Sequence, residues 1–218
     1  MDYKGYLELT LTEDDLASFY NDKTPYIELL RENQYLLIKD STGEVVDKYC
    51  RQNDELRQVF FCKLGGSFTG AIKPRNPQQV CLFDMLKDKT SKIKLVTGRF
   101  GSGKTLAMTN AALELIEKGK FERIVWVRNN VSVKDAPEIG YLPGTEIDKL
   151  MPYVMPLADH AGGEEGIKKM LENGTLEVIP LGHLRGRSLR NCIVFCTECE
   201  NLTRQHIQLL MGRIDEGS

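Results

Sequence analysis

From about residue 94 onward, apolar residues fall into short runs of two to four positions, separated by polar stretches and helical repeats. Runs of this length without polar alternation are typical of strands that are buried on both faces of a parallel sheet. The sequence predicts four such strands, at residues 94–97, 124–127, 176–179 and 193–196.

Helical patterns lie between and after these predicted strands. Residues 103–118 place Leu106, Leu113 and Ile116 on one side of a helix, and residues 207–214 form a closing amphipathic helix. Strands and helices that alternate in this way indicate an α/β fold with a mostly parallel sheet.

The first third of the chain has a different pattern. Thr12 precedes three acidic residues and is expected to begin a helix that fades near Asn21. Residues 35–39 and 44–49 are short β-rich runs around a turn, which predicts a hairpin, and residues 55–62 extend it with a third strand. We therefore expect a small β-rich segment at 1–72 and a larger domain at 73–218, with the boundary in a Pro-containing stretch that begins at Lys73.

Composition narrows the class of protein. The 218 residues are 41% hydrophobic and 28% charged, which is usual for a globular protein and excludes extended disorder. No apolar run approaches the roughly 20 residues that span a bilayer, and the first 20 residues have no apolar signal-peptide core, so we expect no membrane partner and a cytoplasmic location. The net charge is −2, divided as −5 over residues 1–72 and +3 over residues 73–218, which suggests two parts with different roles.

The strongest chemical signal is a glycine-rich motif at residues 98–105, of the form G-x-x-x-x-G-K-[ST]. Its glycines let the backbone curl so that N–H groups point at phosphate oxygens. Lys104 is expected to reach the β- and γ-phosphates, and the Thr105 hydroxyl to bind Mg²⁺. The motif lies between a predicted strand and a predicted helix, which is the context of a nucleotide site. The predicted phosphate-binding residues are Gly98, Gly101, Ser102, Gly103, Lys104 and Thr105.

Several further motifs, in this order along the chain, resemble those of the PhoH family of P-loop ATPases, which is related to superfamily-1 helicases. They are Lys73–Gln79, the 98–105 loop, Ile139–Gly144 with Lys149, Pro152 and Tyr153 close behind, Pro180–Arg187, and Thr197–Asn201. The resemblance implies a three-layer, RecA-like P-loop core that binds ATP and Mg²⁺, with coupling to RNA and assembly into homo-oligomeric rings. Residues 24–72 resemble the β-rich connector of longer members, which carry a PIN-type ribonuclease domain upstream.

This sequence departs from the family pattern at two places. Where the family has an Asp-Glu pair, the chain has Thr197-Glu198, and a neutral hydroxyl adds no charge to a Mg²⁺ site. The chain also ends at Ser218, before the family's later motifs, which predicts a core that is incomplete at its C-terminus. Two functions stay open: an ATP-hydrolysing protein, and a nucleotide-binding module without turnover. A small-molecule kinase is a further reading of the same loop.

The resemblance also assigns roles at the end of the strand predicted at 193–196. Thr197 takes the position of a metal-holding residue. Glu198 takes the position of the residue that prepares the attacking water, and its alternative is an exposed acid at a strand end.

Five other residues have two readings each. Asn76 is expected to cap a helix, and it is also a candidate nucleotide-binding residue together with Gln79. Gln79 resembles an adenine-reading glutamine, and it could equally close a capping box with Asn76. Arg185 and Arg187 are candidate contacts to the phosphate of RNA or of a neighbour's nucleotide, and otherwise they are solvated loop charges. Arg128, at a strand end, is a catalytic or nucleic-acid contact or a surface charge.

Six cysteines are expected to be free thiols in a reducing compartment. Cys192, Cys196 and Cys199 have a spacing that can hold an iron–sulfur cluster on a loop. The first two bracket a predicted strand, which would spread their thiols over roughly 13 Å. Buried free thiols are the alternative that this geometry favours.

Overall fold

The computed structural model describes residues 3–66, 70–128, 151, 154–197, 199–215 and 217–218. The chain divides into two compact units. One unit holds residues 1–63 and 73–94, and the other holds residues 64–72 and 95–218.

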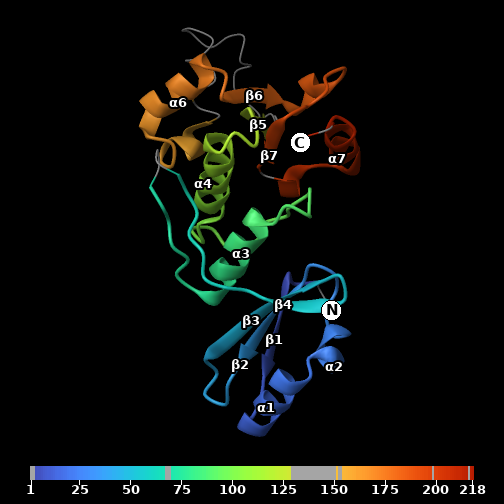
Figure 1. Ribbon diagram of the computed structural model, residues 1–218. Helices are drawn as coiled ribbons and strands as arrows, with labels where there is room; N and C mark the ends of the chain where they lie inside the picture. Colours follow the sequence, from blue (N-terminus) through green and yellow to red (C-terminus); the bar gives the residue numbers. More distant parts are fainter. Residues whose placement is uncertain (1–2, 67–69, 129–150, 152–153, 198, 216) are drawn as a thin grey trace. The chain divides into compact units, whose positions relative to one another are not determined.

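The first unit is built on a four-stranded sheet of order β1-β2-β3-β4 (Figure 1). β1 pairs in parallel with β2, and the other two pairings are antiparallel. The strands are β1 (Tyr6–Thr10), β2 (Tyr35–Lys39), β3 (Val45–Gln52) and β4 (Glu55–Gln58), and the helices are α1 (Glu13–Asn21), α2 (Thr24–Ile27) and α3 (Pro77–Lys87).

Strand β2 is buried on both faces and divides the core of this unit in two. Leu36 and Ile38 pack in a cluster with Phe19 of α1, whereas Leu37 packs in a second cluster with Val80 of α3. Successive side chains of a strand point to opposite faces, so one strand contributes to both clusters. The sheet is therefore covered by α1 on one face and by α3 on the other.

The predicted helix start and hairpin are confirmed in the first unit. The Thr12 side chain caps α1 by accepting the Asp15 N–H at 3.3 Å, and the helix ends at Asn21. β2 and β3 form the hairpin around the turn at 40–43, and β4 is the third strand. β1 was not predicted from the sequence.

Helix α3 belongs to the first unit, which differs from the boundary expected at Lys73. Its Asp84 carboxylate accepts a hydrogen bond from the Tyr35 hydroxyl at 2.9 Å and two from the Arg57 guanidinium at 3.0 and 2.7 Å. Its apolar side also completes the cluster around Leu37. Residues 64–72 precede α3 in the sequence but belong to the second unit. There the Gly65 N–H donates to the Glu114 carboxylate at 3.0 Å.

The second unit contains a parallel sheet of order β6-β5-β7, together with helices (Figure 1). Its described elements are α4 (Lys104–Glu117), β5 (Arg123–Arg128), α6 (Gly163–Glu172), β6 (Leu176–Pro180), η2 (Leu181–Leu184), β7 (Cys192–Cys196), η3 (Cys199–Asn201) and α7 (Arg204–Met211). Among the described residues, none of the helices is both long and apolar enough to cross a bilayer.

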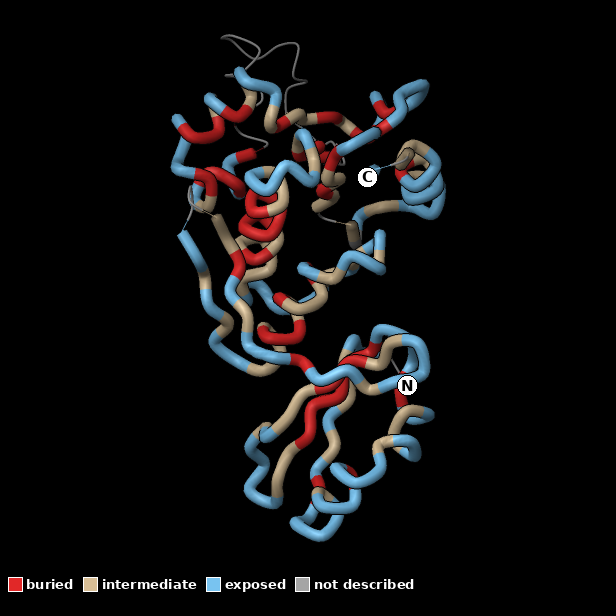
Figure 2. Tube along the Cα trace, in the orientation of Figure 1, coloured by how far each residue is buried: buried red, intermediate tan, exposed pale blue. Residues whose placement is uncertain are grey.

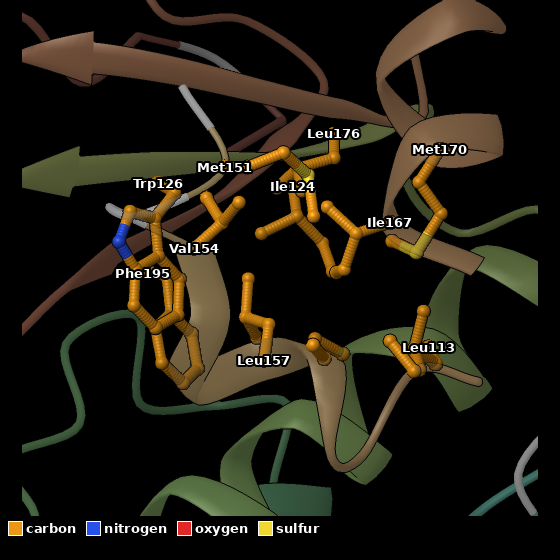
Figure 3. Close-up of a cluster of buried hydrophobic side chains, with 13 residues drawn as sticks. Leu113, Ile124, Trp126, Met151, Val154, Leu157, Ile167, Met170, Leu176 and Phe195 are labelled. Atoms are coloured by element: carbon orange, nitrogen blue, oxygen red, sulfur yellow. The ribbon is translucent and has the colours of Figure 1, made fainter. Parts of the chain in front are cut away.

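Both faces of this sheet are covered, and the central strand β5 is buried from Ile124 to Val127 (Figure 2). One cluster joins Trp126 to α4, α6 and the helical residues 154–158, while the other joins Val125 and Val127 to η2 and α7. The Trp126 ring stacks on Phe195 with centroids 4.9 Å apart (Figure 3). Three layers around a parallel sheet confirm the predicted α/β fold.

One predicted strand is wrong. Residues 94–97 form no strand, and the Leu95 side chain is 74% exposed. Lys94 instead donates from its ammonium to the carbonyls of Asp88 at 2.8 Å and Ser91 at 2.5 Å, at the end of α3. The apolar run is only two residues long, Leu95 and Val96, so little burial favours a strand over this anchored, extended path.

Candidate functional site

The glycine-rich loop turns through left-handed backbone just before α4. Gly101 has a φ of 74° and Gly103 a φ of 84°, and Gly103 is the N-cap of α4. A residue with a Cβ is strained in this region, so these two positions require glycine. The Ser102 N–H donates to the Arg99 carbonyl at 3.3 Å and closes the turn.

Lys104 folds its side chain back over this loop. Its ammonium donates to the Gly98 carbonyl at 2.8 Å and to the Arg99 carbonyl at 2.9 Å. These carbonyls hold the positive charge at the loop, immediately beside the N-terminus of a 14-residue helix. The ammonium and the helix dipole together make this place attractive to an anion.

Phe100 is a feature of the loop to which the sequence analysis gave no role. Its side chain is 98% exposed, and the Lys104 ammonium lies 5.8 Å from the centre of its ring. An aromatic residue among the glycines of the motif was the signal that could have identified it. The ring covers one side of the lysine, in the range of a cation–π contact.

The far part of α4 is anchored by buried polar groups, which the sequence analysis also missed. Asn110 is 1% exposed and its amide donates to the Leu106 carbonyl at 2.9 Å. Glu114 is 9% exposed, pairs with Lys118 and accepts the Gly65 N–H. The sequence did contain a signal for them, because Asn110 and Glu114 occupy helix positions at which an apolar stripe would continue. The contact with Gly65 ties the helix that carries Lys104 and Thr105 to residues 64–72, whereas the contacts with Leu106 and Lys118 are local to the helix and its C-cap.

The carboxyl ends of the three parallel strands meet at one edge of the sheet. Arg128 pairs with Pro180, and Val127 pairs with Cys196. Arg128 is therefore the last residue of β5 at that same edge, and the half-buried Thr197 directly follows β7 there. This edge is where open α/β sheets bind ligands. The side chain of Arg128 and the whole of Glu198 lie outside the described part of the structure.

In the Arg-Gly-Arg segment, residues 185–187, the described ion pair of Arg187 lies away from this edge. Arg187 forms an ion pair with Glu177, the second residue of β6, and Glu177 also accepts a hydrogen bond from Arg123 of β5 at 3.2 Å. Glu177 pairs with Val125, so Arg187 points toward the amino-terminal half of β6. Arg185 is exposed, and Gly186 between the two has a φ of 77°.

The first unit contains the other two candidate residues, Asn76 and Gln79. The Asn76 side chain caps α3 by accepting the Gln79 N–H at 2.8 Å, which confirms the predicted cap. The Gln79 side chain carbonyl accepts the Arg75 N–H at 2.7 Å. Gln79 thus helps to cap α3. Its side chain binds the N–H of Arg75, one residue before the N-cap residue whose N–H is bound in a standard capping box. Its contact with adenine stays a prediction.

The cysteines are free thiols, and no cluster of metal ligands occurs among the described residues. Cys192 and Cys196 stand at the two ends of β7, as the strand prediction required. The Cys199 thiol donates to the Cys196 carbonyl at 3.1 Å. Burial and the neighbouring Cys199 thiol raise the pKa of the Cys196 thiol to about 12. The iron–sulfur reading therefore has no support in this part of the chain.

The motif at Ile139–Gly144, with Lys149, Pro152 and Tyr153, falls outside the described residues. Its contribution to the site stays a prediction.

Comparisons with known proteins agree with the loop and the fold. The family described as "PhoH-like protein" matches residues 71–218. The chain is 30% identical to Protein PhoH2 of Thermobispora bispora over 99% of its own length and 50% of that protein. It is 28% identical to Protein PhoH2 of Bacillus subtilis over 99% of its length and 51% of that protein. The chain thus spans about half the length of these curated relatives, and it belongs to the PhoH family.

Proposed function

We propose that this chain binds ATP together with Mg²⁺ at residues 98–105 and hydrolyses the ATP. The observation that carries the proposal is the loop itself. Two left-handed glycines lead directly into α4, and the Lys104 ammonium is held at the loop by two of its carbonyls. Membership of the PhoH family supports a nucleotide as the ligand.

The residues at the loop fit a triphosphate. Backbone N–H groups of 101–105 and the Lys104 ammonium would stabilise negative charge on the phosphates as it shifts during transfer to water. The Lys104 ammonium donates to two neutral carbonyl oxygens at an exposed site. A charged phosphate oxygen is a stronger acceptor than a carbonyl oxygen, so a bound phosphate can replace these two hydrogen bonds. In this proposal Glu198 orients the attacking water.

The fit to Mg²⁺ rests on two hydroxyl groups. Thr105 is the second residue of α4 and Thr197 follows β7, and both are half-buried. Bound Mg²⁺ would neutralise charge between the phosphates. A hard cation prefers a carboxylate, so Thr197 makes this a weaker site than an aspartate would.

Thr197 also supports a second candidate function, which is nucleotide binding without turnover. In that case the chain would change shape or partner when ATP binds. Phosphate release separates the two functions, and transfer of phosphate to an added acceptor would point to a kinase instead.

Calorimetry of ATP binding, with and without Mg²⁺, tests the proposal when it is paired with phosphate release in the same sample. Mg²⁺-dependent binding with release supports hydrolysis. Binding without release supports the second candidate. A sample that does not bind ATP rules out both.

Matched variants sharpen this experiment. Lys104→Ala is expected to abolish binding, whereas Lys120→Ala, which removes an exposed lysine beyond the end of α4, is expected to leave it unchanged. Thr197→Asp is expected to strengthen the Mg²⁺ dependence. A large gain in phosphate release from Thr197→Asp would favour the second candidate for the natural chain.

The further proposals concern partners. Coupling to RNA and ring assembly are suggested by the family. RNA-stimulated phosphate release is the test of coupling, and Arg185→Ala is expected to reduce the stimulation because the arginine is exposed and could contact an RNA phosphate. Arg187→Ala tests the same role, and an unchanged stimulation would confine Arg187 to its pair with Glu177.

A further inference from the structure

Three consecutive residues of the phosphate loop surround the charge of Lys104. The carbonyl oxygens of Gly98 and Arg99 accept hydrogen bonds from its ammonium at 2.8 and 2.9 Å, and the ammonium lies 5.8 Å from the centre of the Phe100 ring. The carbonyls use two of the three N–H donors that an ammonium has. The loop thus holds, with its own atoms, the charge that is expected to bind phosphate.

The Phe100 ring stands in solvent, which limits what it can contribute to the fold. Its side chain is 98% exposed, so almost none of its surface is removed from water by the chain. A ring in this position gains next to nothing from apolar burial. Attraction between the face of a ring and a cation does not require burial, and it acts within about 6 Å of the ring centre. The contact with Lys104 is therefore the interaction through which this ring can act on the loop.

We propose that Phe100 regulates the phosphate loop, because its ring holds the Lys104 ammonium against the loop in competition with phosphate. The proposal rests on the proposed function, since it concerns the same lysine and the same phosphates. A triphosphate draws the ammonium away from the two carbonyls and from the ring. The cation–π contact is then lost, so the affinity for the triphosphate is lower than it would be without the ring. At an exposed site this loss amounts to about two- to fivefold in the dissociation constant.

The ring can be changed without disturbing the rest of the loop. Phe100→Leu removes the aromatic face and keeps an apolar side chain. Phe100 does not have a positive φ and its side chain is not buried, so the change adds no backbone strain and leaves no cavity. Phe100→Trp should strengthen the contact, because tryptophan is the best cation–π partner. Phe60→Leu, at an exposed ring of the first unit, is the matched control.

Calorimetry of the full chain with inorganic tripolyphosphate and with ATP, both with Mg²⁺, tests the competition. Phe100→Leu is expected to bind both ligands about two- to fivefold more tightly than the wild type, and Phe100→Trp to bind both more weakly. Phe60→Leu should match the wild type. Tripolyphosphate has no base, so a gain with this ligand cannot come from stacking. Equal affinities in the wild type and Phe100→Leu overturn the proposal. Weaker binding in Phe100→Leu also overturns it, and assigns the ring to a contact with the ligand.

Nuclear magnetic resonance tests the contact itself, before any phosphate is added. Protons above an aromatic face resonate upfield because of the ring current. In a chain labelled with ¹³C-lysine, the ε-methylene signal that Lys104→Ala removes is expected to move downfield in Phe100→Leu. Lys23, whose ammonium lies 5.7 Å from the centre of the Phe19 ring, should keep its shift and serves as the reference. A Lys104 signal that is the same in the wild type and Phe100→Leu overturns the contact.

These measurements separate the failure of this proposal from the failure of the proposed function. Neither of them depends on hydrolysis, so a chain that binds ATP without releasing phosphate fails as an ATPase and still tests the competition. Tight binding with no difference between the wild type and Phe100→Leu overturns the role of the ring alone. A chain that binds neither tripolyphosphate nor ATP overturns both the nucleotide site and the competition, whatever the Lys104 signal shows.

Discussion

Single side chains in the first unit hold together elements that are distant in the sequence. Asp84 of α3 binds the Tyr35 hydroxyl of β2 and, through both oxygens, the Arg57 guanidinium of β4. A two-pronged pair between a guanidinium and a carboxylate is stronger and more directional than a single bond. Burial, with the Asp84 charge as a second cause, raises the pKa of Tyr35 well above its ordinary value. The tyrosine therefore stays protonated and remains a donor.

Replacement of Asp84 should be costly for the first unit. Asp84→Ala leaves the buried Tyr35 hydroxyl without its acceptor, and we expect the free energy of unfolding to fall by about 1–3 kcal/mol. Asp84→Asn keeps an acceptor and should cost less. Glu44→Ala, at an exposed turn position, is the control. Urea denaturation followed by circular dichroism measures the effect, and equal stability of Asp84→Ala and the control would contradict this role.

We expect the ionisation of Asp88 to make the free energy of unfolding depend on pH. Partial burial opposes its ionisation, but hydrogen bonds from Ser91 and Thr90 outweigh this and lower its pKa from 3.8 to about 2. A lowered pKa in the folded state stabilises the fold above the unfolded value, and this contribution is lost as the pH falls through the folded value. The stability difference between the wild type and Asp88→Asn should therefore shrink between pH 4 and pH 2. Urea midpoints at several pH values measure it, and a constant difference would refute the assignment.

Among the elements, helix α4 is the one that joins the core of the second unit to the phosphate loop. Its sequence was sufficient to predict the helix, because the apolar spacing and the glycine stop are both local signals. The strands β5, β6 and β7 were predicted for the same reason. The strand predicted at 94–97 does not form, because its two apolar residues could not outweigh the anchoring of Lys94 to the end of α3. β1 was missed because it depends on pairing with β2, whose partner residues lie 29 positions further along the chain, as in the pair Tyr6 and Tyr35.

The loop offers a test in which backbone conformation alone is changed. A Cβ at Gly101 would meet nothing within 4 Å, so Gly101→Ala is strained only by its φ of 74°. That conformation costs about 1–2 kcal/mol for a residue with a side chain, and distortion to relieve it should weaken ATP binding about tenfold. Gly182→Ala is the matched control, because Gly182 also has open space but no positive φ. Calorimetry compares them, and equal ATP affinity in the two variants would show that the left-handed turn is not needed.

At the scale of the whole molecule, the chain has two units whose hydrophobic clusters share no residue. The sequence placed the change of pattern near residue 73, and the change of charge agrees with it. Sequence alone did not show that α3 stays with the first unit and that residues 64–72 join the second. Those assignments come from long-range contacts, at Asp84 and at Glu114, that no local pattern encodes.

The single tryptophan makes it possible to follow one unit separately. Trp126 is 1% exposed in the second unit, so its fluorescence reports on that unit alone, while circular dichroism reports on both. Leu157→Ala removes a fully buried side chain from the Trp126 cluster (Figure 3). Leu37→Ala removes a fully buried side chain from the first unit. Each should cost about 2–5 kcal/mol in its own unit.

Separate cores predict separate responses. Leu157→Ala should lower the urea midpoint detected by Trp126 fluorescence. Leu37→Ala should leave that midpoint unchanged and should lower the urea midpoint of the part of the circular dichroism signal that comes from the first unit. ATP with Mg²⁺, at 100 times its dissociation constant, should raise the fluorescence midpoint by the equivalent of about 2.7 kcal/mol, because it binds the folded second unit. If Leu37→Ala shifts the fluorescence midpoint as far as Leu157→Ala does, the two units unfold as one. The phosphate loop would then depend on the packing of the N-terminal sheet as much as on its own core.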